Sequence, residues 1–194
     1  MRIEWRHSGG KTARDVHARL EELARAAVRE GPICAPHCAR AATCPCTRDC
    51  PRIPVTLSSD PQKYPIETNI APLAFEIKRL GVFDPCWSCE GHNDSADKLR
   101  NAPAVWFYAH SVTHVRLLSE SLSDIFYDNR LSRPWHVRLT FSDPDNVGTT
   151  FPLEPRSADE KSLYALRRDI MHLSEDIGWR MEKRAEALRR SIAP

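Results

Sequence analysis

The chain has 194 residues, 41% of them hydrophobic and 28% charged, which is the composition of a soluble globular protein. A formal net charge of +2 is too small to indicate a nucleic-acid-binding protein. The sequence contains neither a signal-peptide core nor an apolar run of about 18 residues, the length that a membrane-spanning helix needs. We therefore expect a cytoplasmic protein with no membrane partner, in which thiols stay reduced.

The N-terminal part of the chain predicts a helix followed by an irregular, cysteine-rich segment. Thr12 can cap a helix over residues 12–30, which Gly31 and Pro32 would end. Five cysteines and repeated prolines then fill residues 32–54, a composition that does not form long helices or strands. Residues 55–57 are expected to be extended.

The middle of the chain alternates helices and strands. Asn69 is expected to cap a helix that ends at Gly81, and Ser111 one that ends near residue 128. The stretch Ala104–His110 is apolar on both faces, which predicts a central strand. The apolar stripes expected to be buried by the two helices are Ile70, Leu73, Ile77 and Leu80, and Val115, Leu118, Leu122 and Ile125.

The C-terminal part predicts two strands and a long helix. Apolar residues alternate over Pro134–Phe141, and residues 149–153 are expected to return antiparallel to it. Ser157 can cap the last helix, which Gly178 is expected to weaken. We therefore predict an α+β fold with a small mixed or antiparallel sheet, helices packed on it and a long C-terminal helix. Residues 1–54 would form a cysteine-rich, metal-binding appendage, and residues 55–194 the α+β domain.

The five clustered cysteines include two C-x3-C pairs that could bind one metal ion. Cys34 and Cys38 form the first pair and Cys46 and Cys50 the second, with Cys44 as a substitute ligand. Four thiolates suit a tetrahedral zinc ion, and zinc is the cofactor that we expect. An iron–sulfur cluster also suits four closely spaced thiolates, and free or disulfide-bonded cysteines are a third possibility.

A second concentration of reactive side chains occupies residues 88–92, where we place the candidate catalytic site. Glu90 could act as a general base, His92 as an acid, a base or a ligand, and Cys89 as a nucleophile beside Ser88. Cys86 and Cys89 could also form a redox couple or half of a zinc site. The alternative is a tight turn in which Glu90 only caps the backbone.

Two further histidines could join this loop. His110 ends the central strand and is the fifth candidate catalytic residue, and His136 lies on the next predicted strand. If both strand ends met the loop, then His92, His110 and His136 could bind a catalytic zinc ion with an open position. The alternative for His136 is an exposed side chain beside Arg138.

Residues Ser88-Cys89-Glu90-Gly91-His92 are followed by Trp106-Phe-Tyr-Ala-His110 and a predicted helix. This arrangement resembles the core of the wybutosine-synthesis methyltransferases of tRNA, which have Ser-Ser-Cys-Ser-Gly-Arg followed by a tryptophan-led strand that ends in histidine. The resemblance implies chemistry that depends on S-adenosylmethionine.

The stretch Pro134-Trp135-His136-Val137 is similar to the terminal zinc-ligand strand of the D-Ala-D-Ala-type peptidases. That similarity implies that His92 and Asp97 take the places of the upstream zinc ligands of the family.

Taken together, these patterns predict a cytosolic zinc-binding protein with an enzyme-like site at residues 88–92. The reaction and the partner, a small molecule or RNA, stay open. One alternative is a zinc-stabilised module that binds RNA or protein without chemistry. The other is a zinc hydrolase that uses the three histidines.

Overall fold

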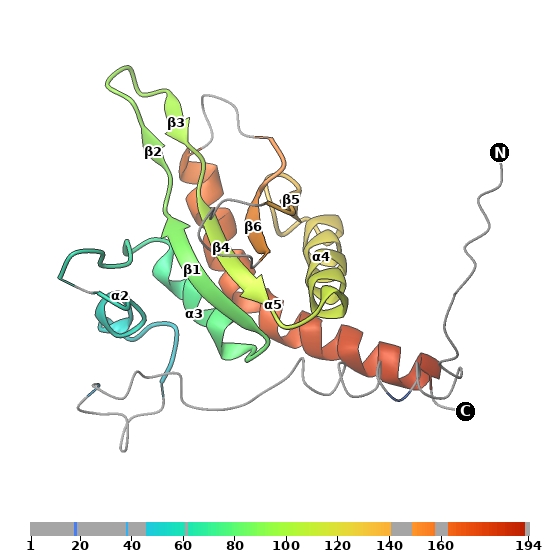
Figure 1. Ribbon diagram of the computed structural model, residues 1–194. Coiled ribbons are helices and arrows are strands. Elements are labelled where there is room, and N and C mark those ends of the chain that lie inside the picture. Colours follow the sequence, from blue (N-terminus) through green and yellow to red (C-terminus); the bar gives the residue numbers. More distant parts are fainter. Residues whose placement is uncertain are drawn as a thin grey trace.

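The computed structural model describes residues 18, 38, 46–60, 62–140, 149–157 and 163–192, and it confirms an α+β fold (Figure 1). The strands of the main antiparallel sheet follow one another in the order β1 (Phe83–Cys89), β4 (Ala104–Ala109), β6 (Thr150–Pro155) and β5 (Trp135–Val137). A separate hairpin consists of β2 (His92–Asn93) and β3 (Leu99–Asn101). The helices are α2 (Ile53–Thr56), α3 (Ala71–Arg79), α4 (Val112–Tyr127) and α5 (Leu163–Ile192).

The core lies between the sheet and three helices. The long helix α5 contacts both α3 and α4 (Figure 1). Phe83 and Phe107 are fully buried, and their rings meet edge to face at 4.8 Å between centroids, an arrangement that aromatic pairs favour. The predicted stripe of α3 is buried, as are Leu118, Leu122 and Ile125 of α4. Ser111 caps α4 as expected, since its hydroxyl accepts a hydrogen bond from the backbone N–H of His114.

The pairing of β1 with β4 decides which residues can meet. Phe83 lies opposite Ala109 and Cys89 lies opposite Ala104, so β4 is confirmed as a central strand that runs antiparallel to β1. After Cys89 the chain turns at residues 90–91 and enters the β2–β3 hairpin. The Cys89–His92 turn and His110 are therefore at opposite ends of the β1–β4 pair.

Two local predictions are wrong for reasons of side-chain chemistry. Residues 53–56 form the short helix α2 instead of an extended segment, because Pro54 occupies its first turn, where a missing N–H costs nothing. Asn69 does not cap α3, whose N-cap is Ile70. The Asn69 side chain binds a carboxylate in the β1–β2 turn instead.

In the C-terminal part of the chain, the structure differs from two further predictions. The strand expected over Pro134–Phe141 is limited to Trp135–Val137, and Phe141 lies outside the described residues. Helix α5 continues through Gly178, where a Cβ atom would lie 2.6 Å from Nη2 of Arg79. Glycine at this position therefore leaves room for the Arg79 guanidinium, which pairs with the buried carboxylate of Glu76.

Candidate metal centre

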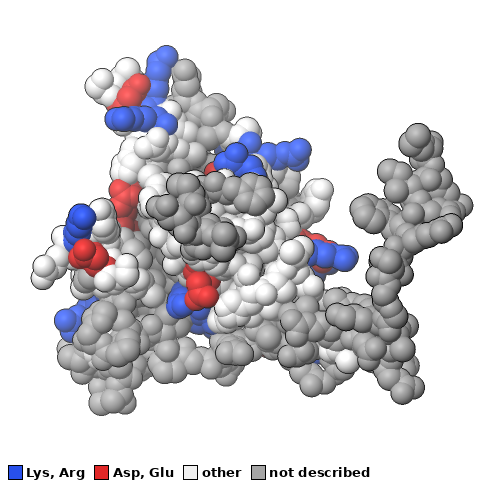
Figure 2. Space-filling model, in the orientation of Figure 1, with Lys and Arg blue, Asp and Glu red and all other residues white. Residues whose placement is uncertain are grey.

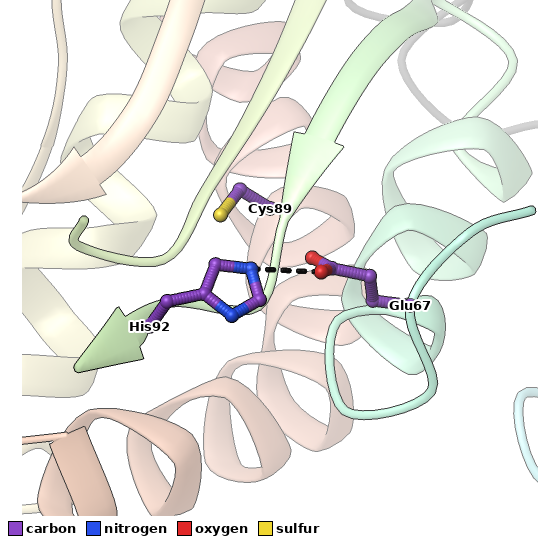
Figure 3. Close-up of side chains that lie close together, drawn as sticks. All are labelled: Glu67, Cys89 and His92. Atoms are coloured by element: carbon purple, nitrogen blue, oxygen red, sulfur yellow. Dashed lines mark ion pairs between the residues drawn. The ribbon is translucent and has the colours of Figure 1, made fainter. Parts of the chain in front are cut away.

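Three potential metal ligands from two separate segments meet at the end of β1 (Figure 3). Glu67 precedes α3, Cys89 ends β1 and His92 begins β2. A carboxylate oxygen, the thiol sulfur and an imidazole nitrogen of these residues all lie within 4.8 Å of one another. Among the described parts of the chain, this is the one group of three or more such ligand atoms so closely spaced.

Gly91 gives the turn its shape. Its φ of +83° belongs to the left-handed region that side chains disfavour. A Cβ atom there would lie 2.7 Å from Cδ1 of Leu163 and 2.9 Å from Cδ of Pro103, so the turn also packs too closely for any side chain. The backbone N–H of Gly91 donates to the sulfur of Cys89 at 3.4 Å. The glycine therefore lets the chain reverse between Cys89 and His92, so that both face the same space.

Glu67 is held by both of its oxygens. Its Oε2 accepts a hydrogen bond from the backbone N–H of Glu90 at 2.7 Å, and its Oε1 forms an ion pair with Nε2 of His92 at 2.8 Å. These contacts orient the carboxylate toward the turn, as Figure 3 shows. No motif marks Glu67 as a ligand, because it lies in an irregular segment 22 residues before Cys89.

The Cys89 thiol is buried in this arrangement. The residue is 5% exposed and is not part of a disulfide. Burial raises the pKa of its thiol, and the carboxylates of Glu67 and Glu90 raise the pKa further, while the Gly91 N–H opposes the change. An activated cysteine nucleophile needs a lowered pKa. A divalent cation would reverse this balance, since a coordinated thiol loses its proton.

Glu90 does not have the surroundings of a general base. Its Oε2 accepts hydrogen bonds from the backbone N–H and from Nδ2 of Asn69, both at 2.9 Å. Its Oε1 pairs with Nη2 of Arg167 at 2.9 Å. Both oxygens of Glu90 therefore have protein partners, as in the alternative in which Glu90 caps backbone.

The predicted zinc site of three histidines does not form. His110 lies at the far end of β4, roughly 20 Å along the strand from the Cys89 end, and binds Asp84 at 3.2 Å. His136 lies on β5, three strands from β1 or roughly 14 Å across the sheet, and faces Glu154. The antiparallel register separates the three rings, so the hydrolase alternative that used them is wrong.

The remaining candidates on β1 point elsewhere. Successive strand residues face opposite sides, so Ser88 lies on the opposite face of β1 from Cys89. Cys86 is exposed while Cys89 is buried, and three residues of extended chain separate them by about 10 Å. This geometry does not suit a C-x2-C redox couple.

The predicted four-cysteine site falls partly outside the described residues. Cys34 and Cys44 lie there, so this site stays a prediction, as does the iron–sulfur alternative. Cys46 and Cys50 are half-buried and pack against a small apolar cluster of Ile53, Ala71 and Phe75. Ile66 joins the same cluster, so this segment is connected to the residue that precedes Glu67.

The donor atoms of Glu67, Cys89 and His92 fit a zinc ion. Zinc takes sulfur, nitrogen and oxygen ligands, and tetrahedral bonds of about 2.1–2.3 Å place neighbouring donors roughly 3.5 Å apart. The ligand atoms lie within 4.8 Å, and the 2.8 Å Glu67–His92 ion pair would have to open slightly. Small side-chain movements would therefore bring the three atoms to bonding distance of one ion.

Comparison of the chain with protein-family models, curated proteins and solved structures found no match. The resemblances to the wybutosine-synthesis methyltransferases and to the D-Ala-D-Ala-type peptidases therefore stay predictions. None of the described helices is long and apolar enough to cross a membrane. Lysine and arginine side chains lie interspersed with acidic ones among the described residues of the face in Figure 2.

Proposed function

We propose that this chain is a zinc-binding protein in which Glu67, Cys89 and His92 hold one Zn²⁺ ion. Three protein ligands are the number typical of catalytic zinc sites, in which a water molecule or a substrate takes the fourth position. Bound there, zinc would act as a Lewis acid and would acidify a coordinated water molecule. The proposal replaces the catalytic roles predicted for Ser88, Glu90 and His110.

One observation carries the proposal. The three donor atoms come from two segments that are far apart in the sequence, and they lie within 4.8 Å of one another. Hydrogen bonds from Glu90 and Gly91 orient Glu67 and Cys89 toward the same space. A site with ligands already held in place loses less conformational entropy when it binds its ion.

A half-open groove lies beside the proposed site. The groove has a volume of about 620 Å³, within the range of ligand-binding clefts. It lies between the β2–β3 hairpin and the first turns of α5, and its lining includes Asn93, Tyr164 and Arg167. Asn93 follows His92 directly, and Arg167 binds the carbonyl of Gly91 at 3.2 Å, so the groove adjoins the proposed zinc ligands.

Zinc analysis of two cysteine variants tests the proposal. We expect Cys89→Ser to lose about one equivalent of zinc per chain relative to the wild type, because a weak oxygen donor replaces the thiolate. Cys86→Ser, on the exposed side of the same strand, is the matched control and should keep the wild-type content. Equal zinc content in both variants and the wild type would overturn the proposal, whatever the five clustered cysteines of residues 34–50 bind.

A further inference from the structure

Arg167 of α5 contacts the metal-site turn without supplying a ligand. Its Nη2 atom donates both to Oε1 of Glu90 at 2.9 Å and to the carbonyl oxygen of Gly91 at 3.2 Å. The helix around it is firmly anchored, because Leu166 and Ile170 are fully buried in the core. The guanidinium therefore fixes the turn between Cys89 and His92 against the body of the protein.

Glu90 extends this contact to the segment that carries the third ligand. Its second carboxylate oxygen accepts two hydrogen bonds from Asn69, which follows Glu67 by two residues. The backbone N–H of Glu90 also donates to the Glu67 carboxylate at 2.7 Å. A continuous chain of hydrogen bonds, Arg167–Glu90–Asn69, thus joins α5 to both segments that contribute the proposed metal ligands.

We propose that Arg167 is a positioning residue of the metal site, which acts through Glu90 to hold Glu67, Cys89 and His92 in binding geometry. The proposal rests on the proposed zinc function. Hydrogen bonds between a guanidinium and a carboxylate are charge-assisted, and Glu90 is largely buried, with 16% of its side chain exposed. It follows that metal affinity depends on how the first turns of α5 are docked.

Zinc affinity of single and double variants tests this role. Outer partners of metal ligands typically change affinity by about 10–100-fold, and we expect Arg167→Gln to weaken zinc binding by a factor in this range. Arg168→Gln is the matched control. Arg168 is the exposed neighbour of Arg167 in the sequence, so this variant should bind zinc as the wild type does. Because Arg167 acts through Glu90, the double variant with Glu90→Gln should lose no more affinity than the weaker-binding single variant.

Two readouts separate positioning from a loss of folding. Binding is measured by chelator competition at temperatures where circular dichroism shows every variant folded. Cobalt(II) replaces zinc in parallel, because its visible spectrum reports ligand geometry. We expect Arg167→Gln to change the cobalt spectrum, and Arg167→Lys, which keeps the charge, to restore part of the lost affinity.

A measurement without metal distinguishes failure of this proposal from failure of the zinc function. In the metal-free protein, Cys89 should be alkylated several-fold faster in Arg167→Gln than in Arg168→Gln, as mass spectrometry of the Cys89 peptide would show. If the wild type binds no zinc but this difference appears, the zinc function fails and the positioning role stands. Unchanged alkylation and unchanged zinc affinity in Arg167→Gln would overturn the positioning role.

Discussion

At each end of β1 a histidine lies against a carboxylate, yet only the Cys89 end brings three possible metal ligands together. At the Asp84 end, His110 lies 3.2 Å from the carboxylate, and Lys78 binds the other carboxylate oxygen. At the Cys89 end, His92 lies 2.8 Å from Glu67, and a buried thiol is beside them. The ion pair between histidine and carboxylate is therefore common to both ends, and the third partner differs.

That third partner decides what each end can do. Lys78 is a cation, so it stabilises the ionised carboxylate of Asp84 and would repel a metal ion. Both members of the His110–Asp84 pair are half-exposed, where ion pairs contribute little to stability. At the other end, Cys89 offers a third donor atom, and the turn at Gly91, which has a positive φ, holds it close to His92. The backbone geometry and the third side chain therefore distinguish the candidate metal site, since the histidine–carboxylate pair is present at both ends.

The largest effect is expected from glycine substitution at the two ends. Gly91→Ala combines the left-handed strain with contacts of 2.7 and 2.9 Å to Leu163 and Pro103, so we expect a loss of about 3 kcal/mol or more of stability and the loss of zinc binding. Gly81, with a φ of +68°, precedes the other end of β1. Chemical denaturation should show that Gly81→Ala costs about 1–2 kcal/mol, the cost of that backbone conformation, with zinc affinity unchanged.

Next in size is the effect of removing each histidine. We expect His92→Ala to weaken zinc binding more than 100-fold, because loss of a direct ligand exceeds the roughly 10–100-fold effect of an outer partner. His110→Ala removes the corresponding ring at the other end and should bind zinc as the wild type does. Isothermal titration of the two variants checks this, and a similar loss of affinity in both would contradict the assignment of the site.

The smallest effect concerns the pH dependence of the Asp84 end. The hydrogen bond from Lys78 lowers the pKa of Asp84, burial opposes this, and His110 lowers the pKa further. A lowered pKa contributes stability that is present above the ordinary value of 3.8 and is lost as the pH falls through the lowered value. Asp84→Asn should therefore cost less than about 1 kcal/mol at neutral pH, where denaturant unfolding measures it, and almost nothing in strong acid. A constant difference across this range would show that the ion pair is not its cause.

The helical periodicity and the strand pattern were enough to predict most of the fold. The apolar stripes of α3 and most of that of α4, the cap at Ser111 and the central position of β4 are confirmed, because each depends on nearby residues. The density of reactive groups at residues 88–92 also indicated the turn that contains Cys89 and His92, two of the three possible metal ligands. Gly91, within this turn, adopts a backbone conformation that other residues resist.

The ligand set itself was not predictable, because it depends on tertiary packing. Glu67 meets Cys89 only after α3 docks against β1, and Arg167 reaches Glu90 only after α5 lies across the turn. Neither residue has a spacing or a motif that marks it. The predicted histidine cluster with His110 and His136 is wrong for a related reason, since the sequence pattern does not determine strand order or register. Those two properties placed the rings at distant positions of the sheet.

The most direct test is X-ray absorption at the zinc edge of a variant in which the five front cysteines are replaced by serine. These are Cys34, Cys38, Cys44, Cys46 and Cys50. We predict that this variant still binds zinc, with one sulfur at about 2.3 Å and the remaining ligands nitrogen or oxygen at about 2.0–2.2 Å. Absence of bound zinc in the folded variant, or a zinc shell without sulfur, would contradict a metal site built from Glu67, Cys89 and His92.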